Sequence, residues 1–423
     1  MTAVRSALAG LTMRGRSMLA CGLALVVWAV TLGQADFLRI AVFLLALPLV
    51  AAVAVTRTRY RLSCTRGLDP PSLQVGSTTT VNIRLDNVSS LPSSSLLIED
   101  TLPPSLGRRP RFIVDRIEAG TGRDITYALH PQERGRHRIG PLAVLLTDPF
   151  GICELSRQFT TGSDLVVHPT VWSLPSVRLG TQRVGGGDVA SRSVVAGGSG
   201  DGSTRQYRRG DDLRKVHWRS TARVGELMVR REEQPAQSRA TLLLNGRAGA
   251  HRGSGGQSSY EWSVSAVASV GVVLARAGYA LELVDDTGTR IGDGVPLTES
   301  ALLDTLADVA TSQASVQMSS RHLRHGADEL LVAVLGALDA SLADDLAGLR
   351  RGTGTCIAIL LDTNSWAPAG AGAQAAYRAS ATRLAAAGWR VLPIARGEQL
   401  ASVWPMAGRG AVSTVRPPVA ASA

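Results

Sequence analysis

The sequence predicts a multidomain protein with three consecutive parts: an N-terminal transmembrane helical hairpin, an antiparallel β-sandwich domain and an α/β doubly wound domain. Three patterns predict this fold class. Two apolar runs near the N-terminus are each long enough to cross a bilayer as a helix. Alternating apolar and polar residues follow, as in half-buried antiparallel strands. In the C-terminal half, continuous apolar runs alternate with helical stretches, as in a parallel sheet covered by helices.

The expected transmembrane hairpin occupies residues 17–56. Its first apolar run is SMLACGLALVVWAVTLG, residues 17–33, and its second is FLRIAVFLLALPLVAAVAV, residues 37–55. The second run contains Pro48, which membrane helices tolerate. A cleaved signal peptide is the competing interpretation. We prefer the hairpin because a second apolar run follows the first and no clear cleavage site is present.

The distribution of arginines predicts the orientation of the hairpin. The formal net charge is +11, and residues 1–66 carry +7 of it, with eight Arg and one acid. Arginines flank both outer ends of the hairpin, so the positive-inside rule places residues 1–16 and the large C-terminal part in the cytoplasm. We therefore expect a multi-pass protein of the cell membrane with cytoplasmic soluble domains. The other 357 residues carry only +4 with mixed signs, which disfavours a nucleic-acid partner.

A β-sandwich domain is expected over residues 67–184. Apolar and polar residues alternate in TTTVNIRLDN and again in DITYALH. Turn-forming segments such as VGS, DNVSS and EAGTG separate these runs, as in a sandwich of roughly immunoglobulin type. A strand over residues 142–146 and a DPFG turn end the domain.

Residues 185–203 are rich in Gly and Ser and are expected to form a linker. The α/β domain is expected over residues 239–412, with strands ATLLLN, YALELVDD, ELLVAVLG, TCIAILLDT and WRVLPIA. Its helices are expected over residues 260–277, 298–313, 339–350 and 371–387. Ligands of such sheets bind at the carboxyl ends of the strands. No GxGxxG follows the first strand, which argues against a dinucleotide. The polar residues at those ends are Asn245, Arg247, Asp285, Asp286 and Asp362.

The segment TRQYRRGDDLRKVHWRSTARVGELMVRREEQ, residues 204–234, is the most distinctive part of the sequence, with nine basic and five acidic side chains. Its middle part is expected to form a short helix capped by Asp211 or Asp212, because a carboxylate accepts from free N–H groups at a helix start. On that helix Leu213, Val216, His217 and Ser220 would share a face. GELMVRREEQ is expected to be a strand. The mixed charges favour bidentate ion pairs, either in a buried joint between domains or in a partner-binding surface.

This segment resembles the signature of the domain of unknown function 58 family, which runs roughly R-x-Y-x-x-G-D-D-x-R-x-I-D-W-x-x-[ST]-A-R-x-G-x-L-x-V-R. The DPFG turn and the N-terminal hairpin also fit the family, so the resemblance extends over the chain. One position departs, because His217 stands where many members have Asp. The matching residues form the candidate binding site: Arg205, Tyr207, Gly210, Asp211, Asp212, Arg214, Trp218, Ala222, Arg223, Gly225 and Arg230.

The resemblance implies a function and partners. It implies that the C-terminal domain is similar to a von Willebrand factor A domain. It names a MoxR-type AAA+ ATPase and a transglutaminase-like membrane protein as candidate partners, since these are often encoded beside family members. We therefore expect a membrane-anchored, non-catalytic interaction or assembly protein in contact with the lipid bilayer and such an ATPase. The alternative is a hydrolase acting at the cluster of Asp211, Asp212 and arginines, although no pairing of nucleophile and base stands out there.

No cofactor, catalytic residue or metal is expected. A von Willebrand-type Mg²⁺ site places D-x-S-x-S just after the first strand, whereas the aligned residues here are Asn245, Arg247 and Gly249. Arg247 would bring a cation to the position of the ion, and the acids after the second and fourth strands are expected to pair with it. The four cysteines show no C-x-x-C spacing, so neither a zinc site nor a disulfide framework is indicated.

Overall fold

The computed structural model describes residues 11–57, 62–147 except 91 and 94, 151–152, 154–177, 179, 204–207, 216–230, 238–292, 296–313, 329–349, 354–368, 370 and 372–408. The chain divides into two compact units. Unit 1 comprises Met1–Thr170 with Leu306–Val309, and unit 2 comprises Val171–Thr305 with Ala310–Ala423. The sequence placed the end of the β domain at residue 184, whereas the observed division falls after Thr170.

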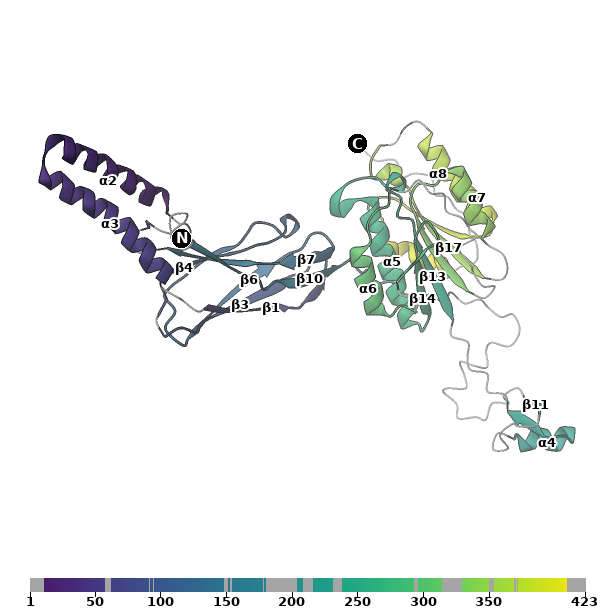
Figure 1. Ribbon diagram of the computed structural model, residues 1–423. Coiled ribbons are helices and arrows are strands. Elements are labelled where there is room, and N and C mark those ends of the chain that lie inside the picture. Colours follow the sequence, from purple (N-terminus) through teal and green to yellow (C-terminus); the bar gives the residue numbers. More distant parts are fainter. Residues whose placement is uncertain are drawn as a thin grey trace. The chain divides into compact units, whose positions relative to one another are not determined.

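Unit 1 begins with two apolar helices, α2 (Met13–Leu32) and α3 (Ala35–Arg57), shown in dark purple in Figure 1. Thr12 caps α2 with its side chain, and Gly33 ends it in the left-handed conformation at φ 67°. By length and composition α2 can cross a membrane; within the described residues it is the one helix that meets this criterion. A membrane anchor and a signal sequence share these properties. The transmembrane hairpin therefore stays a prediction.

The two helices pack closely where one of them carries a glycine. A Cβ atom on Gly22 of α2 would lie only 2.8 Å from Cγ of Leu45 on α3, so a larger side chain would push the helices apart. The start of α2 also contacts the loop that contains Gly151. The Thr12 hydroxyl donates to the Gly151 carbonyl at 2.7 Å, and Leu11, Ala51 and Ile152 form a small apolar cluster beside it.

The rest of unit 1 is built from strands in three small sheets. The sheets have the orders β1-β3-β6, β2-β10-β7 and β5-β4-β8-β9. Neighbouring strands are antiparallel except β2 and β10, which are parallel. The strands are β1 (Leu62–Asp69), β2 (Ser72–Gln74), β3 (Thr79–Asn87), β4 (Leu96–Asp100), β5 (Arg111–Val114), β6 (Gly122–Leu129), β7 (Gly135–Ile139), β8 (Leu142–Thr147), β9 (Glu154–Phe159) and β10 (Ser163–His168).

Alternation along the strands builds one shared core. Val81, Ile83 and Leu85 of β3 are fully buried, while the polar residues between them are exposed, as the sequence pattern predicts. Leu96 of β4 and Leu165 of β10 belong to the same buried cluster, so all three sheets contribute to it. Burying each such side chain contributes about 1.5–3 kcal/mol. The more specific prediction, a sandwich of immunoglobulin type, goes beyond these observations.

A buried ion pair lies within unit 1. Nη2 of Arg66 lies 2.5 Å from Oδ1 of Asp100, and the two side chains are 2% and 0% exposed. The Tyr127 hydroxyl donates to Oδ2 of Asp100 at 2.6 Å, and Nη1 of Arg66 donates to the Ile139 carbonyl at 2.7 Å. Burial raises the pKa of Asp100, and the contacts with Tyr127 and Arg66 only partly oppose this.

Unit 2 contains a six-stranded sheet of order β15-β14-β13-β16-β17-β18, parallel except for β15 at one edge. The strands are β13 (Arg239–Leu244), β14 (Ala280–Val284), β15 (Arg290–Ile291), β16 (Leu330–Leu335), β17 (Thr355–Leu361) and β18 (Arg390–Ile394). The helices are α5 (Ser259–Arg276), α6 (Glu299–Asp308), α7 (Ala340–Gly348), α8 (Ala373–Ala386) and the short α9 (Leu400–Val403). Five strands and four helices were predicted at these places. The third predicted strand, β16, lies next to the first, β13. The helix α6 ends five residues before its predicted end at residue 313.

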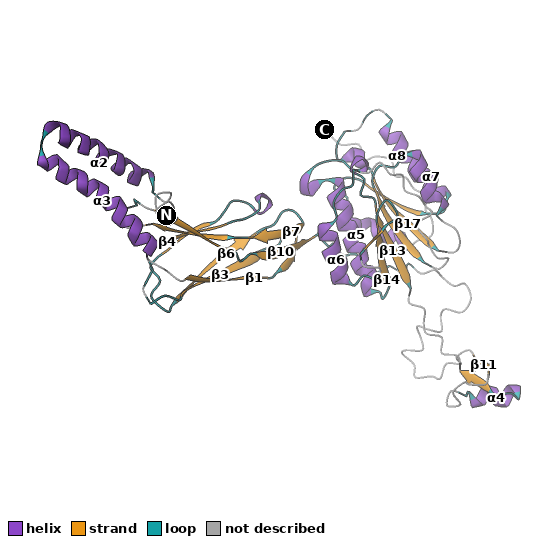
Figure 2. Cartoon of the chain, in the orientation of Figure 1, coloured by secondary structure: helices purple, strands orange, loops and turns teal. Residues whose placement is uncertain are grey.

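Helices cover both faces of this sheet (Figures 1 and 2). Leu243 of β13 faces the side of α7 and α8, in a cluster with Leu346 and Leu384. Leu242, one residue earlier, faces the other side, where a Cβ on Gly271 of α5 would lie 3.0 Å from it. The chain leaves β13 for β14 on one side and later returns to β16 on its other side. The carboxyl ends of β13 and β16 therefore flank the topological switch point, where such sheets bind ligands.

Candidate functional site

The distinctive segment forms a small module of β11 (Thr204–Gln206), α4 (Trp218–Val224) and β12 (Met228–Arg230). The two strands are antiparallel, with Arg205 opposite Val229. The backbone N–H of Tyr207 extends the pairing by donating to the Leu227 carbonyl at 2.7 Å. The backbone places Arg205 and Arg230 on the two strands. Four predicted site residues, Gly210, Asp211, Asp212 and Arg214, lie outside the described residues.

The predicted start of the helix is wrong. The helix α4 begins at Trp218, and its cap is His217, whose Nδ1 accepts from the Ser220 N–H at 3.3 Å. Val216 is not helical; it forms a β-bridge with Val229, and both side chains are buried. A β-branched residue with a buried partner strand favours this extended pairing over a helical turn. The cap within the described residues is His217, whereas Asp211 and Asp212, the predicted caps, lie outside them.

Two further positions of the signature hold the module together. The Thr221 hydroxyl donates to the His217 carbonyl at 3.1 Å and accepts from the Met228 N–H at 3.0 Å, so it links the helix to β12. Gly225 ends α4 in the left-handed conformation at φ 79°, and its N–H donates to the Thr221 carbonyl at 2.8 Å. A side chain at position 225 would be strained in this conformation. These residues therefore have structural roles.

The module exposes an apolar and cationic surface. Trp218 is 70% exposed, Val224 57% and Leu227 40%. Ala222 is exposed as well, and Arg219 and Arg223 lie exposed one helical turn apart. Large contiguous apolar patches mark interaction sites, and Trp and Arg are the side chains that contribute most to such sites. We call this the α4 surface: Trp218, Arg219, Ala222, Arg223, Val224 and Leu227.

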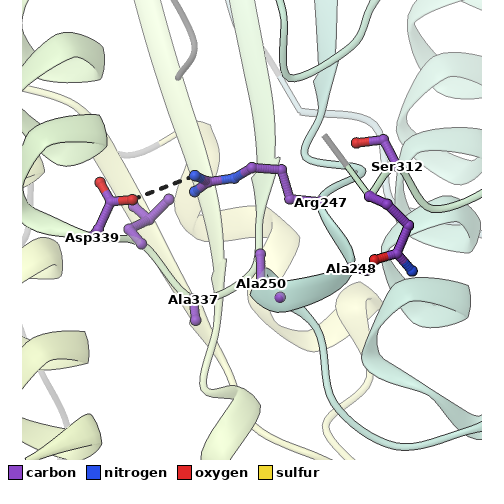
Figure 3. A pocket seen from close by; sticks show the side chains of 9 residues that line it. Arg247, Ala248, Ala250, Ser312, Ala337 and Asp339 are labelled. Carbon is purple, nitrogen blue, oxygen red and sulfur yellow. Dashed lines mark hydrogen bonds and ion pairs between the residues drawn. The ribbon is translucent and has the colours of Figure 1, made fainter. Parts of the chain in front are cut away.

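A second candidate site is a cavity of about 350 Å³ at the carboxyl ends of β13 and β16 (Figure 3). It lies at the topological switch point of the sheet. We call it the strand-end crevice. Its lining residues are Arg247, Ala248, Gly249, Ala250, Ser312, Gln313, Ala337, Leu338 and Asp339.

Arg247 reaches across the crevice toward Asp339 (Figure 3). Its Nη1 lies 3.4 Å from Oδ2 of Asp339, and the side chains are 18% and 54% exposed. The other carboxylate oxygen of Asp339 caps α7 by accepting from the Leu342 N–H at 2.7 Å. That backbone bond, and Arg247 after it, lower the pKa of Asp339.

Two of the acids that were predicted to pair with Arg247, Asp285 and Asp362, make other contacts instead. Asp285 accepts from the backbone N–H groups of Thr287 and Thr289, both at 2.9 Å. Asp362 caps the turn that follows β17. Asp286 is buried beside the Gly246 N–H, and burial raises its pKa. The carboxylate paired with Arg247 is Asp339, which the sequence placed only as the first residue of an expected helix.

The described residues also bear on metal binding. Within them, no group of three or more His, Cys, Asp or Glu side chains could hold a metal ion. The polar side chains at the switch point are Asn245, which is buried and accepts from the Arg247 N–H at 3.2 Å, and His251. His251 donates from Nε2 to the Asn245 carbonyl at 2.6 Å, and burial lowers its pKa. These groups support the loop after β13.

Comparison with known proteins finds a family match that includes the module. The model of the family described as protein of unknown function DUF58 matches residues 203–329. This part of the chain is therefore similar to the DUF58 family. The matched range begins with the module and ends just before β16, so it includes the loop after β13 that carries Arg247.

One curated relative and two solved structures show how far the similarity extends. Uncharacterized protein YeaD of Bacillus subtilis (strain 168) is 27% identical over 188 residues, which cover 43% of this chain and 47% of that protein. The chain thus spans about half the length of this relative. The CARDB domain of the PF1109 protein from Pyrococcus furiosus, crystallised with di-metal ions, aligns at 13% identity and a TM-score of 0.20, covering 26% of this chain and 93% of that chain. The putative ApaA protein from Bordetella pertussis aligns at 11% identity and a TM-score of 0.20, covering 26% and 94%. Likenesses this low carry no argument about fold or function.

Proposed function

We propose that this DUF58 protein is a membrane-anchored, non-catalytic interaction protein that binds a partner protein through its α4 surface. The exposure of Trp218 beside Arg219 and Arg223 carries the proposal. The bonds of His217 and Thr221 hold the helix in place, so its exposed side chains are presented in an ordered arrangement. Pre-ordered Trp and Arg side chains lose little conformational entropy on binding, which favours affinity.

A MoxR-type AAA+ ATPase is the partner that we propose, with a transglutaminase-like membrane protein as the second candidate. The pairing comes from the family resemblance. The α4 surface adds a requirement for the partner's chemistry: an apolar pocket for Trp218 next to acidic side chains that face Arg219 and Arg223. Complementary charges of this kind mainly steer association and fix the orientation of the complex.

We further propose that α2 and α3 form a transmembrane hairpin, with both of its ends and the two soluble parts in the cytoplasm. In the same scheme the β part of unit 1 is an immunoglobulin-type sandwich and unit 2 is von Willebrand factor A-like. A bilayer would cover the large apolar side chains that both helices expose, among them Leu23, Val27, Trp28, Val30, Ile40, Val42 and Phe43. An exterior-active reporter fused after Ala423 should give no signal, and a strong signal would reverse the orientation.

Photo-crosslinking tests the partner proposal. A photoreactive amino acid placed at Ala222, in membranes that contain the co-expressed MoxR-type ATPase, should crosslink to the ATPase. Trp218→Ala in the same protein should lower the yield more than tenfold, because a central Trp at an interface contributes about 2 kcal/mol or more. Ile113→Ala is the matched control, since Ile113 is 77% exposed in unit 1. Equal crosslinking in the Trp218 and Ile113 variants would refute the role of the α4 surface.

A further inference from the structure

We propose that the strand-end crevice binds a carboxylate group of a peptide, with Arg247 as the side chain that receives it. The inference deepens the proposed function, because the peptide belongs to an interaction partner. It concerns a different surface from the α4 surface and a defined chemistry: an Asp or Glu side chain, or a chain terminus, bound without a metal ion.

The unused donors of Arg247 are the first argument. A guanidinium has five N–H donors, and charged hydrogen bonds of this type are usually about 2.7–2.9 Å long. Within the described residues the Arg247 side chain makes one such bond, to Asp339, and its length is 3.4 Å. Its Nε is buried and lacks a hydrogen-bond partner in the described part of the chain. Leaving a charged donor buried and unpaired is costly, and the N–H groups on the two Nη atoms make only this one long bond within the described residues, so they can bind an incoming anion.

The crevice also offers a second donor. Oγ of Ser312 is buried and, in the described part of the chain, lacks a hydrogen-bond partner. The backbone fixes this residue, since its N–H donates to the Gly246 carbonyl at 2.8 Å and its carbonyl accepts from the Ala248 N–H at 2.9 Å. In Figure 3 Arg247 lies between Ser312 and Asp339. Both side chains line the same cavity, and a guanidinium alone can bind both oxygens of a carboxylate.

The charges of the crevice favour a carboxylate over the other anions. Among its lining residues one cation, Arg247, is matched by one anion, Asp339. A carboxylate with a single charge can take the place of Asp339 one for one, whereas a doubly charged phosphate would be repelled by Asp339. The Arg247 charge in turn opposes a metal ion at this place, because like charges a few ångströms apart repel.

Displacing Asp339 would cost little. Its side chain is 54% exposed, so the carboxylate oxygen released by Arg247 would be hydrated by solvent water. Ion pairs with a solvent-exposed carboxylate contribute little to stability. The other oxygen would keep its bond to the Leu342 N–H, so α7 would stay capped. Asp339 therefore forms a weak ion pair with Arg247, and a ligand carboxylate would compete with Asp339 for the guanidinium.

A titration with small probes tests the inference on the full chain in lipid nanodiscs. The probe is N-acetyl-glutamate methylamide, and the neutral N-acetyl-glutamine methylamide is its control. Ligand-detected NMR should show saturable binding of the Glu probe, more than tenfold weaker binding of the Gln probe, and loss of Glu-probe binding in Arg247→Gln. Arg276→Gln should bind as wild type, since Arg276 is an exposed arginine of the same unit that pairs with Glu299.

Asp339→Asn gives the decisive variant. Asn keeps the helix cap but releases Arg247, so the Glu probe should bind up to about fivefold more tightly. This gain does not depend on how well Arg247→Gln folds. Weaker binding in Asp339→Asn, wild-type binding in folded Arg247→Gln, or no binding in both wild type and Asp339→Asn would each overturn the inference. If the probe binds at Arg247 while the α4 surface captures no ATPase, the crevice stands and the proposed function fails.

Discussion

Replacing Asp100 by Asn should destabilise the β core of unit 1 by about 3 kcal/mol. Asn has almost the same shape, so the change removes a charge and little packing. The Arg66 side chain, which is 2% exposed, would then be buried without its anionic partner. Removing one partner of a buried ion pair costs about 3–5 kcal/mol. We expect the lower end, because Nη1 of Arg66 keeps the Ile139 carbonyl at 2.7 Å and the Thr161 carbonyl at 3.3 Å.

Hydrogen exchange of the full chain in detergent, followed by mass spectrometry, measures this loss. Amides of β1, β3 and β6 that exchange only on unfolding of the core should exchange more than a hundredfold faster in Asp100→Asn, since each 1.4 kcal/mol is a factor of about ten. Asp124→Asn is the control, because Asp124 is 68% exposed in its pair with Arg84 and should change exchange by less than about fivefold. A change below tenfold in Asp100→Asn would contradict the structural role of the pair.

Two further predictions concern unit 2. His217→Asp should stabilise the module by about 0.5–1 kcal/mol, because Asp is a preferred cap and its charge suits the helix start; slower exchange of the α4 amides would confirm this, and faster exchange would contradict the capping role. Burial lowers the pKa of His251 below the ordinary 6.5, so as pH falls the unfolded chain takes up this proton first. The stability that the neutral ring contributes is therefore present above pH 6.5 and is lost progressively below it. A melting temperature of unit 2 that does not fall between pH 7.5 and 5.5, or that falls equally in His251→Gln, would contradict this.

The strands of unit 2 could be predicted because each buried strand is a continuous run of apolar residues in the sequence. All seven residues of β17, TCIAILL, are buried, and so are all six of β16. Such runs between helical stretches leave few arrangements other than a parallel sheet covered on both faces. The same holds for β3 of unit 1, where strict alternation gives the buried face directly. A pattern that spans one element is enough to place that element.

Contacts between distant segments could not be predicted in this way. Val216 has helix-compatible neighbours, yet it pairs with Val229 because the chain returns after α4. Arg247 pairs with Asp339, 92 residues later, because β16 lies beside β13 and the start of α7 follows β16 after a short turn. Nothing in the spacing of acids and bases reveals this, since Asp285 and Asp286 are closer in sequence. The pairing depends on strand order, which short motifs do not encode.

The cap at position 217 bears on how the DUF58 signature is interpreted. Asp is expected there from the family pattern, and His217 replaces it in this chain. A carboxylate oxygen and an unprotonated imidazole nitrogen have one property in common that a helix start uses: each accepts a hydrogen bond from a backbone N–H. In this chain Nδ1 of His217 is occupied by Ser220, with its N–H at 3.3 Å and its Oγ at 2.8 Å. A side chain engaged in this way holds the start of α4 in place, next to the exposed Trp218. The substitution is therefore conservative for a structural cap, and it favours positioning over reaction chemistry as the role of this position.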